Sequence, residues 1–161
     1  MQILKNPGQK EDATARESLE TFDVLLESFQ HNSILPTIDN HHNLNPIVKV
    51  NQKRFLSAME NIVQNAIESC DKKGEVKIKF QSIVNQKLMI HISDNGKGMT
   101  QDFILERLFR PFDSTKGVSG MGMGVYQSRE FLRSIDGELS VRSEVNVGTQ
   151  FTIEIPVQDT A

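Results

Sequence analysis

Apolar residues recur at helical spacing in three parts of the chain. From residue 17 to residue 30 they return every three or four positions, which predicts an amphipathic helix. A longer helix is predicted from Asn51, a residue type that favours N-caps, to Gly74, a residue type that favours C-caps. A third helix is predicted from about Val125 to Ile135, ending at Gly137.

Strand-type alternation of apolar and polar residues separates these helices. Short strands are predicted at 34–38 and 47–50, an antiparallel pair at 76–80 and 88–92 that turns near 85–86, and two last strands at 139–141 and 151–157. The expected fold class is therefore α+β. We expect a two-layer α/β sandwich, with a mixed, mainly antiparallel sheet of about five strands and three helices on one face.

Composition narrows the class of protein. A length of 161 residues fits one domain, and a formal net charge of -3 gives no reason to expect a nucleic-acid partner. The single cysteine, Cys70, excludes an internal disulfide, and the four histidines match no zinc spacing. No apolar run is long enough for a membrane span, so we expect a cytoplasmic chain, which could still be the soluble part of a membrane-bound protein.

A carboxylate stands at the end of the predicted strand 88–92. Asp94 is followed by Gly96 and Gly98, which permit unusual backbone angles and close approach of a bound group. A fixed carboxylate beside bare backbone suits a flat ligand with an exocyclic amine, such as adenine. Taken alone, Asp-Asn-Gly is also common chemistry for a solvated turn.

Two further polar features accompany this one. Asn61 and Asn65 are four residues apart, so they share one face of the long helix, either as a solvated face or as a ligand-site wall offering amide oxygens to a hard cation. The glycine-rich segment 120–124 leads into the third predicted helix, where free N–H groups favour phosphate. It matches neither a Walker loop nor a dinucleotide fingerprint.

The stretch 99–119 has the character of a lid. It combines a short helical segment at 102–109 with the apolar anchors Phe109 and Phe112 and the cations Arg110 and Lys116. The chain is acidic overall, and taken alone these cations can be surface charges on a loop.

The order of these features resembles the ATP-binding domain of sensor histidine kinases, within the GHKL superfamily of ATPases, and implies the Bergerat-type fold. The resemblance covers residues 17–157; we expect residues 1–16 to be a linker or an upstream remnant, and 158–161 a disordered tail. The segment 112–116 is similar to that of nitrogen-regulator-type kinases, with Ser114 in place of a threonine. The segment 120–127 is similar to kinases of PEP-CTERM sorting systems.

The resemblance implies ATP and Mg²⁺ as cofactors and gives each residue a role. Asn65 would coordinate Mg²⁺, Asp94 would bind the adenine amine, Thr149 would lie behind the adenine, and Asn61 and Lys116 would form the catalytic group. The implied nucleotide-binding residues are Asn61, Asn65, Asp94, Gly96, Gly98, Phe109, Arg110, Phe112, Lys116, Gly120, Gly122, Gly124 and Thr149.

The phosphoacceptor is expected outside this chain. No histidine lies in a helical pattern followed by an acid, so the resemblance implies a catalytic half that phosphorylates a separate dimerisation domain of the same protein, with a response regulator as an indirect partner. We expect the isolated chain to be a monomer. The alternatives are an anti-sigma-type serine kinase, a nucleotide-dead interaction module and a hydrolytic GHKL ATPase. Asn61 argues against the last, because an amide cannot accept a proton from water at neutral pH.

Overall fold

The structure is a computed structural model that describes residues 13–111 and 121–158, with the backbone alone at 121–123. Its elements are β1 (Ala13–Glu17), α2 (Ser18–Ser28), β2 (Thr37–Asp39), β3 (Ile47–Asn51), α3 (Gln52–Ser69), β4 (Val76–Val84), β5 (Lys87–Asp94), α4 (Gln101–Phe103), the π-helix η1 (Ile104–Leu108), α5 (Met121–Ser134), β6 (Glu138–Glu144) and β7 (Gly148–Pro156).

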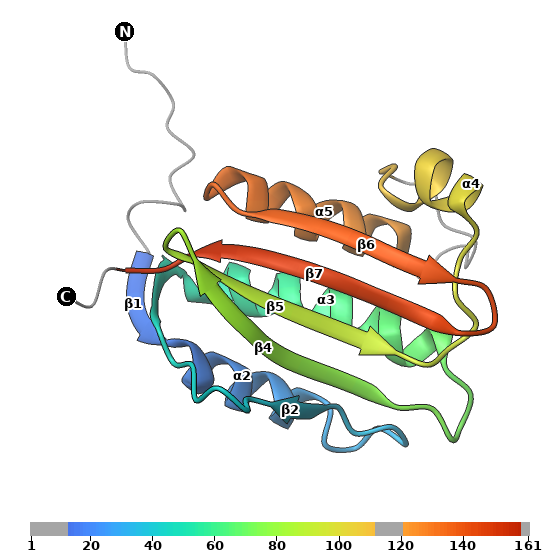
Figure 1. The fold of residues 1–161 in the computed structure, drawn as a ribbon, viewed down its shortest axis with the longest axis horizontal. Helices are drawn as coiled ribbons and strands as arrows, with labels where there is room; N and C mark the ends of the chain where they lie inside the picture. The colour runs from blue at the N-terminus through green and yellow to red at the C-terminus, as the bar shows by residue number, and fades with distance from the viewer. Residues whose placement is uncertain (1–12, 112–120, 159–161) are drawn as a thin grey trace, which may run out of the picture.

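Five strands form the main sheet, in the order β2-β4-β5-β7-β6. The pairs β4–β5, β5–β7 and β6–β7 are antiparallel, and only β2 and β4 run parallel. Helices α2, α3 and α5 all lie on one side of this sheet (Figure 1). The predicted α+β sandwich with a mixed, mainly antiparallel sheet of five strands is confirmed.

The core lies between the sheet and these helices. Ile78, Phe80, Ile92 and Phe151 are fully buried on the inner face, while their strand neighbours point to the open face. Helix α3 contributes a buried stripe to the same core, consisting of Phe55, Ala58, Met59, Ile62, Val63 and Ala66. Because only one face of the sheet is covered, the strands alternate between apolar and polar residues, which is why their pattern was visible in the sequence.

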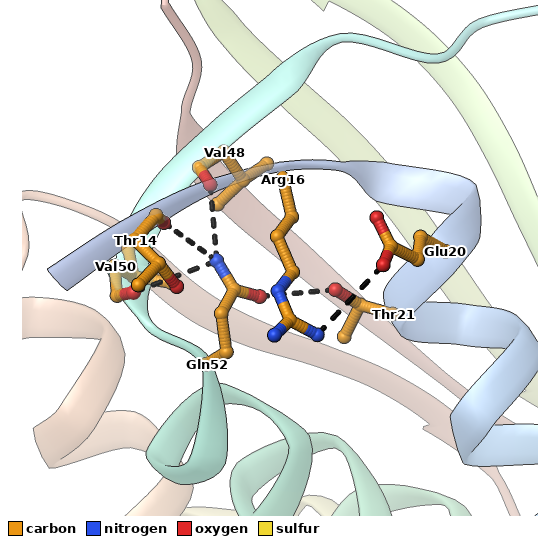
Figure 2. A network of polar contacts seen from close by, with 7 residues as sticks. All are labelled: Thr14, Arg16, Glu20, Thr21, Val48, Val50 and Gln52. Atoms are coloured by element: carbon orange, nitrogen blue, oxygen red, sulfur yellow. Dashed lines mark hydrogen bonds and ion pairs between the residues drawn. The ribbon is translucent and has the colours of Figure 1, made fainter. Parts of the chain in front are cut away.

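A second, two-stranded sheet pairs β1 antiparallel with β3. Figure 2 shows how Gln52, the first residue of α3, ties this sheet to α2. Its side-chain amide donates to the carbonyls of Thr14 and Val48 at 2.9 and 3.1 Å, and its oxygen accepts from the Thr21 hydroxyl at 3.0 Å. The start of α3 is therefore fixed by polar contacts to segments far away in the sequence.

Several boundaries differ from the sequence-based expectation. Residues 13–16 lie in a stretch with no apolar pattern, yet they belong to β1, which is held by backbone pairing and whose side chains are largely exposed. The expected strand at 34–38 begins only at Thr37, after Pro36, a residue that lacks an N–H donor. Helix α3 stops at Ser69 rather than near Gly74, because residues 71–74 form their own turn with the Gly74 N–H donating to the Asp71 carbonyl.

The glycine-rich segment also differs. Helix α5 begins at Met121 rather than at Val125, so Gly122 and Gly124 lie in its first turns and not in a preceding loop. Helical packing at this point overrides the low helix propensity of glycine. Among the described residues, no helix is both long and apolar enough to cross a lipid bilayer.

Candidate functional site

Asp94 is the last residue of β5 and sits opposite Thr149 of β7. Its Oδ1 accepts a hydrogen bond from the Gly96 N–H at 2.8 Å, whereas its Oδ2 is buried and has no hydrogen-bond partner among the described residues. Burial raises the pKa of Asp94, and the Gly96 N–H, the Ser69 side chain and the Thr149 backbone oppose the rise. A buried acceptor without a donor is costly, so this oxygen fits a ligand N–H.

The loop after Asp94 is fastened on both sides. The Lys97 N–H donates to the Ser69 carbonyl at 3.0 Å, and the Asn146 N–H donates to the Lys97 carbonyl at 2.8 Å. The Met99 N–H donates to the Ser143 hydroxyl, which lies 2.7 Å from the Thr149 hydroxyl. The predicted residue Thr149 is thus buried, and its hydroxyl is already engaged by the protein.

Two glycines allow the loop after Asp94 and the start of β7 to approach neighbouring backbone this closely. Gly98 has a φ of 70°, and a Cβ there would lie 2.1 Å from the Glu144 carbonyl oxygen. Gly148 has a φ of 143°, and a Cβ there would lie 2.0 Å from the Asp94 carbonyl oxygen. The predicted residue Gly96 also packs against α3, since its Cβ would lie 2.4 Å from the Ser69 carbonyl. The close approach that the sequence indicated is therefore to the protein's own backbone.

A half-buried polar row leads along α3 away from Asp94. Ser69, Asn65 and Asn61 are spaced four residues apart and share one helical face. At the far end of the row, Gly124 of α5 packs on Asn61. A Cβ added at Gly124 would lie 3.3 Å from the Asn61 Cβ. Eight residues of helix separate Ser69 from Asn61, which is about 12 Å at 1.5 Å per residue. A purine nucleotide can span this row from base to phosphates.

The segment that contains α4 and η1, which follows the loop after Asp94, lies on the α5 side of the molecule (Figure 1). Thr100 caps it, with its hydroxyl accepting from the Phe103 N–H at 3.1 Å. Leu108 is buried, Phe109 is half-buried and Arg110 is exposed. The Arg129 guanidinium of α5 lies over the Phe109 ring, 4.1 Å from its centroid. The predicted site residues Phe112, Lys116 and Gly120 lie outside the described residues.

Three residues of this region were not singled out from the sequence. Ser69 extends the Asn61 and Asn65 row at the same four-residue spacing, which was a usable signal. Ser143 and Arg129 carried no local signal, because their contacts join segments that are 44 and 20 residues away in the sequence.

The side-chain oxygens along the α3 row fit a magnesium ion whose other ligands are mostly phosphate oxygens. The described residues contain no group of three His, Cys, Asp or Glu side chains that could hold a metal by itself. Mg²⁺ in nucleotide sites needs only one or two protein oxygens besides phosphates and waters. The side-chain amides of Asn61 and Asn65 have no hydrogen bond to any described residue, so their oxygens are the ones on this face that remain for such a role.

An open hollow of about 310 Å³ lies at the end of the sheet, beside Asp94. Its lining comes from the ends of β5, β6 and β7 and from the turn between the last two: Ser93, Asp94, Arg142, Ser143, Glu144, Val147, Gly148, Thr149 and Gln150. No residue of α3 lines it. It is therefore a space at the strand ends, distinct from the polar row on α3.

Comparison with known proteins places this geometry in a family. Residues 50–159 match the sequence model described as histidine kinase-, DNA gyrase B-, and HSP90-like ATPase. The chain is 32% identical over 142 residues to sporulation kinase E of Bacillus subtilis (strain 168), covering 88% of this chain and 19% of that protein. The chain thus spans about a fifth of the length of that relative.

Solved structures show the same fold. The catalytic domain of histidine kinase ThkA superimposes with a TM-score of 0.77 at 23% identity, covering 90% of this chain and 95% of that one. Full-length ShkA, solved in complex with AMPPNP, gives a TM-score of 0.79 at 20% identity, covering 92% of this chain and 32% of that one. The chain therefore belongs to the family of histidine kinase-, DNA gyrase B- and HSP90-like ATPases, and it corresponds to the ATP-binding catalytic domain of sensor histidine kinases.

Proposed function

We propose that residues 17–157 bind Mg-ATP along the α3 row and transfer its terminal phosphoryl group to a histidine on a separate dimerisation domain of the same protein. The observation that carries this proposal is the unpartnered, buried Oδ2 of Asp94 at one end of a polar row whose other end meets α5. We place the domain in the cytoplasm as a monomer, with a response regulator receiving the phosphoryl group later.

In this proposal the base lies at the Asp94 end. Oδ2 of Asp94 accepts a hydrogen bond from the adenine amine, and the Thr149 side of β7 backs the ring. Gly96 and Gly98 keep the loop flat beside the base, because their own packing leaves no room for side chains. GTP carries a carbonyl where ATP carries this amine, so its oxygen would face the Asp94 carboxylate with no proton between them.

The phosphates lie at the Asn61 end. Helix α5 begins at Met121, and since the first N–H groups of a helix have no acceptor within it, they and the helix dipole would favour an anion there. Asn65 would hold the Mg²⁺, which neutralises phosphate charge when it is bound. Arg110 and Lys116 would add cations, with Phe112, Gly120 and Gly122 completing this side.

Asn61 suits transfer to a histidine better than hydrolysis. Phosphoryl transfer depends mainly on positioning and electrostatic stabilisation, and an imidazole is itself the nucleophile. Hydrolysis needs a group that orients and deprotonates water, and the neutral Asn61 amide cannot accept that proton. The carboxylate of Glu60 is displaced by about 100° around the helix. We therefore expect slow ATP turnover by the isolated chain.

A titration with a non-hydrolysable ATP analogue tests the proposal. We expect Mg²⁺ to strengthen binding and the GTP analogue to bind at least about tenfold more weakly, because a buried acceptor is left unpaired. Ser93→Ala is the matched control, because Ser93 precedes Asp94 on β5 but bonds to Gln150. This variant should change neither affinity. Equal binding of both nucleotides, or no effect of Mg²⁺, would contradict the proposal.

The phosphorylated product separates the remaining kinase alternatives. When the chain is supplied with ATP and the histidine-bearing domain, the proposal expects an acid-labile phosphoryl group on that domain. An acid-stable product would instead support a serine kinase, and rapid ATP turnover without any partner would support the hydrolytic class.

A further inference from the structure

The contact between Arg129 and Phe109 is the closest approach of a cation to an aromatic ring among the described residues. The guanidinium carbon of Arg129 lies 4.1 Å from the Phe109 ring centroid, whereas Arg54 lies 5.2 Å from the Phe131 ring. The Arg129 Nε is buried and has no hydrogen-bond partner among the described residues. Burial, followed by the charge of Arg133, lowers the pKa of Arg129.

Arg129 is not placed as a surface charge of α5 that forms an ion pair. Arg133, one turn later on the same helix, lies at the surface and pairs with Glu138 at 3.1 Å. Arg129 instead gives up solvent on one side of its guanidinium and covers an aromatic face. Such stacking becomes stronger as the cation loses solvent, and the Arg129 Nε is the part of the guanidinium that is buried here.

Phe109 is one of four side chains of the segment 101–110 that pack on the core, together with Phe103, Ile104 and Leu108. It ends the π-helix η1, directly after the buried Leu108. Leu105 on the same π-helix is 80% exposed, so its side chain contributes little to holding the segment. A π-helix is an uncommon conformation that is frequently found at functional sites. At the C-terminal end of η1, the contacts with the rest of the molecule are the buried Leu108 and the stack of Phe109 with Arg129.

Arg110 follows Phe109 directly. Because a single peptide bond joins the two residues, the contact that fixes Phe109 also restricts the position of the Arg110 backbone, from which the exposed guanidinium extends. Helix α5 carries Arg129 and also begins beside Asn61, through Gly124. The same rigid helix therefore connects the phosphate end of the α3 row to the ring of Phe109.

We propose that Arg129 is a positioning residue, which holds Phe109 by stacking and thereby sets Arg110 beside the phosphate end of the site. The proposal rests on the proposed function for its nucleotide, because a cation near the phosphates matters only if ATP binds along α3. Arg129 itself does not touch the nucleotide in this arrangement. It acts on triphosphate affinity and leaves the base contacts at Asp94 unchanged.

Two measurements on the same chain test the proposal. The first is amide hydrogen exchange of residues 104–110 without nucleotide, and the second is the ratio of the affinities for a non-hydrolysable ATP analogue and for adenosine. Arg129→Gln and Phe109→Leu should each speed exchange in this segment about tenfold, the factor that about 1.4 kcal/mol gives. Each should lower the ATP-analogue affinity about tenfold while leaving the adenosine affinity within about twofold.

Three control variants separate the stacking contact from the charge of α5. Arg133→Gln removes the same charge from α5 and should move neither measurement by more than about twofold, because a surface ion pair contributes little. Arg129→Lys keeps the charge without the planar guanidinium and should lie between wild type and Arg129→Gln. The Arg129→Gln, Phe109→Leu double variant should show the same exchange rates and the same affinity ratio as either single variant, since each single variant already removes the same contact.

Different failures lead to different conclusions. Unchanged exchange in both single variants would overturn the stacking contact as the anchor of the segment. Faster exchange with an unchanged affinity ratio would overturn the positioning role and leave a structural contact. If the wild-type chain binds neither ligand, the proposed function fails and the positioning role for ATP fails with it, while the exchange rates still decide whether Arg129 holds Phe109.

Discussion

The two ends of the α3 row are held in different ways. At the base end, the loop after Asp94 is bound to Ser69 on one side and to the β6–β7 turn on the other, by backbone hydrogen bonds of 2.8 to 3.0 Å. At the other end, the segment 101–110 meets the body of the molecule through side chains: Leu108 is buried, Phe103, Ile104 and Phe109 are partly buried against the core, and Arg129 stacks on Phe109. Leu105 and Arg110 of this segment face solvent.

In the proposed complex, this difference would match what each part of a nucleotide requires. A base is recognised by a few directed hydrogen bonds, so a rigid and preorganised frame lowers the cost of binding it. Phosphates change charge and geometry during transfer, and segments that adapt to them come from the less stable parts of a fold. The loop after Asp94 would then be the part of the site held by backbone hydrogen bonds, and the segment 101–110 the part held by side-chain packing alone.

Replacing Gly148 by alanine should have the largest effect. The Cβ would lie 2.0 Å from the Asp94 carbonyl oxygen at a φ of 143°, a conformation that side chains rarely adopt. We expect a loss of about 3 kcal/mol in the free energy of unfolding, measured by urea denaturation. Gly124→Ala is the control, since its Cβ contact with Asn61 is 3.3 Å, and it should cost less than about 1 kcal/mol. Equal effects would mean that the base end is not rigid.

Asp94→Asn should have the next largest effect, on binding. It removes a carboxylate acceptor from the adenine amine, which is worth about 1.5–3 kcal/mol of ATP-analogue affinity. It should also abolish the preference for ATP over GTP, because the amide can donate to the guanine carbonyl. Isothermal titration with both nucleotides measures this. If affinity were unchanged, the adenine would have to lie elsewhere.

The same carboxylate should make stability depend on pH. Burial raises the pKa of Asp94 in the folded state above its ordinary value of about 4, so the folded state binds the proton more tightly than the unfolded one. Its contribution to stability is therefore fully present below about pH 4 and is lost as pH rises through the raised value.

The nucleotide-free Asp94→Asn variant should therefore gain stability relative to wild type as pH rises from about 4 to 7. The gain is measured as the difference in unfolding free energy between the two proteins at each pH, and it should grow steadily over this range. A difference that stays flat or shrinks over this range would show that Asp94 is not held in a desolvated site.

Leu105→Ser should have the smallest effect. Leu105 is 80% exposed on η1, so little apolar area is lost and the free energy of unfolding should change by less than about 0.5 kcal/mol. Leu108→Ala on the same π-helix is the control, because Leu108 is 4% exposed and its truncation leaves a cavity. A large effect of Leu105→Ser on thermal unfolding would mean that this segment packs more firmly than its exposure indicates.

Much of the fold could be predicted because the sheet is covered on one side only. The alternation at 76–80, 88–92 and 151–157 marks strands with an inner and an outer face, and Asn51 caps α3 by accepting from the Arg54 N–H at 3.0 Å. The antiparallel turn at Asn85 and Gln86 was also expected, and both residues have a positive φ. Each of these features depends on neighbouring residues alone.

The site was only partly predictable. Asp94, Asn61 and Asn65 stood out because polar residues interrupt otherwise apolar elements, and their roles in nucleotide binding remain predictions. The strand β1 and the early start of α5 were missed, since the first is fixed by pairing with β3 and the second includes Gly124, which packs closely on Asn61 of another helix. Gly96 and Gly98 were noticed for their freedom of backbone, but their immediate partners are α3 and β6.

The sequence by itself determined which residues can be helical or extended, where the carboxylate ends its strand, and which family the order of motifs resembles. These are properties of spacing along the chain, and spacing is visible without a fold. Tertiary structure alone decided that Ser69 meets the loop after Asp94, that Ser143 meets Thr149, and that Arg129 covers Phe109. Such contacts arise where separate elements pack together, and no local pattern records which surface each element will meet.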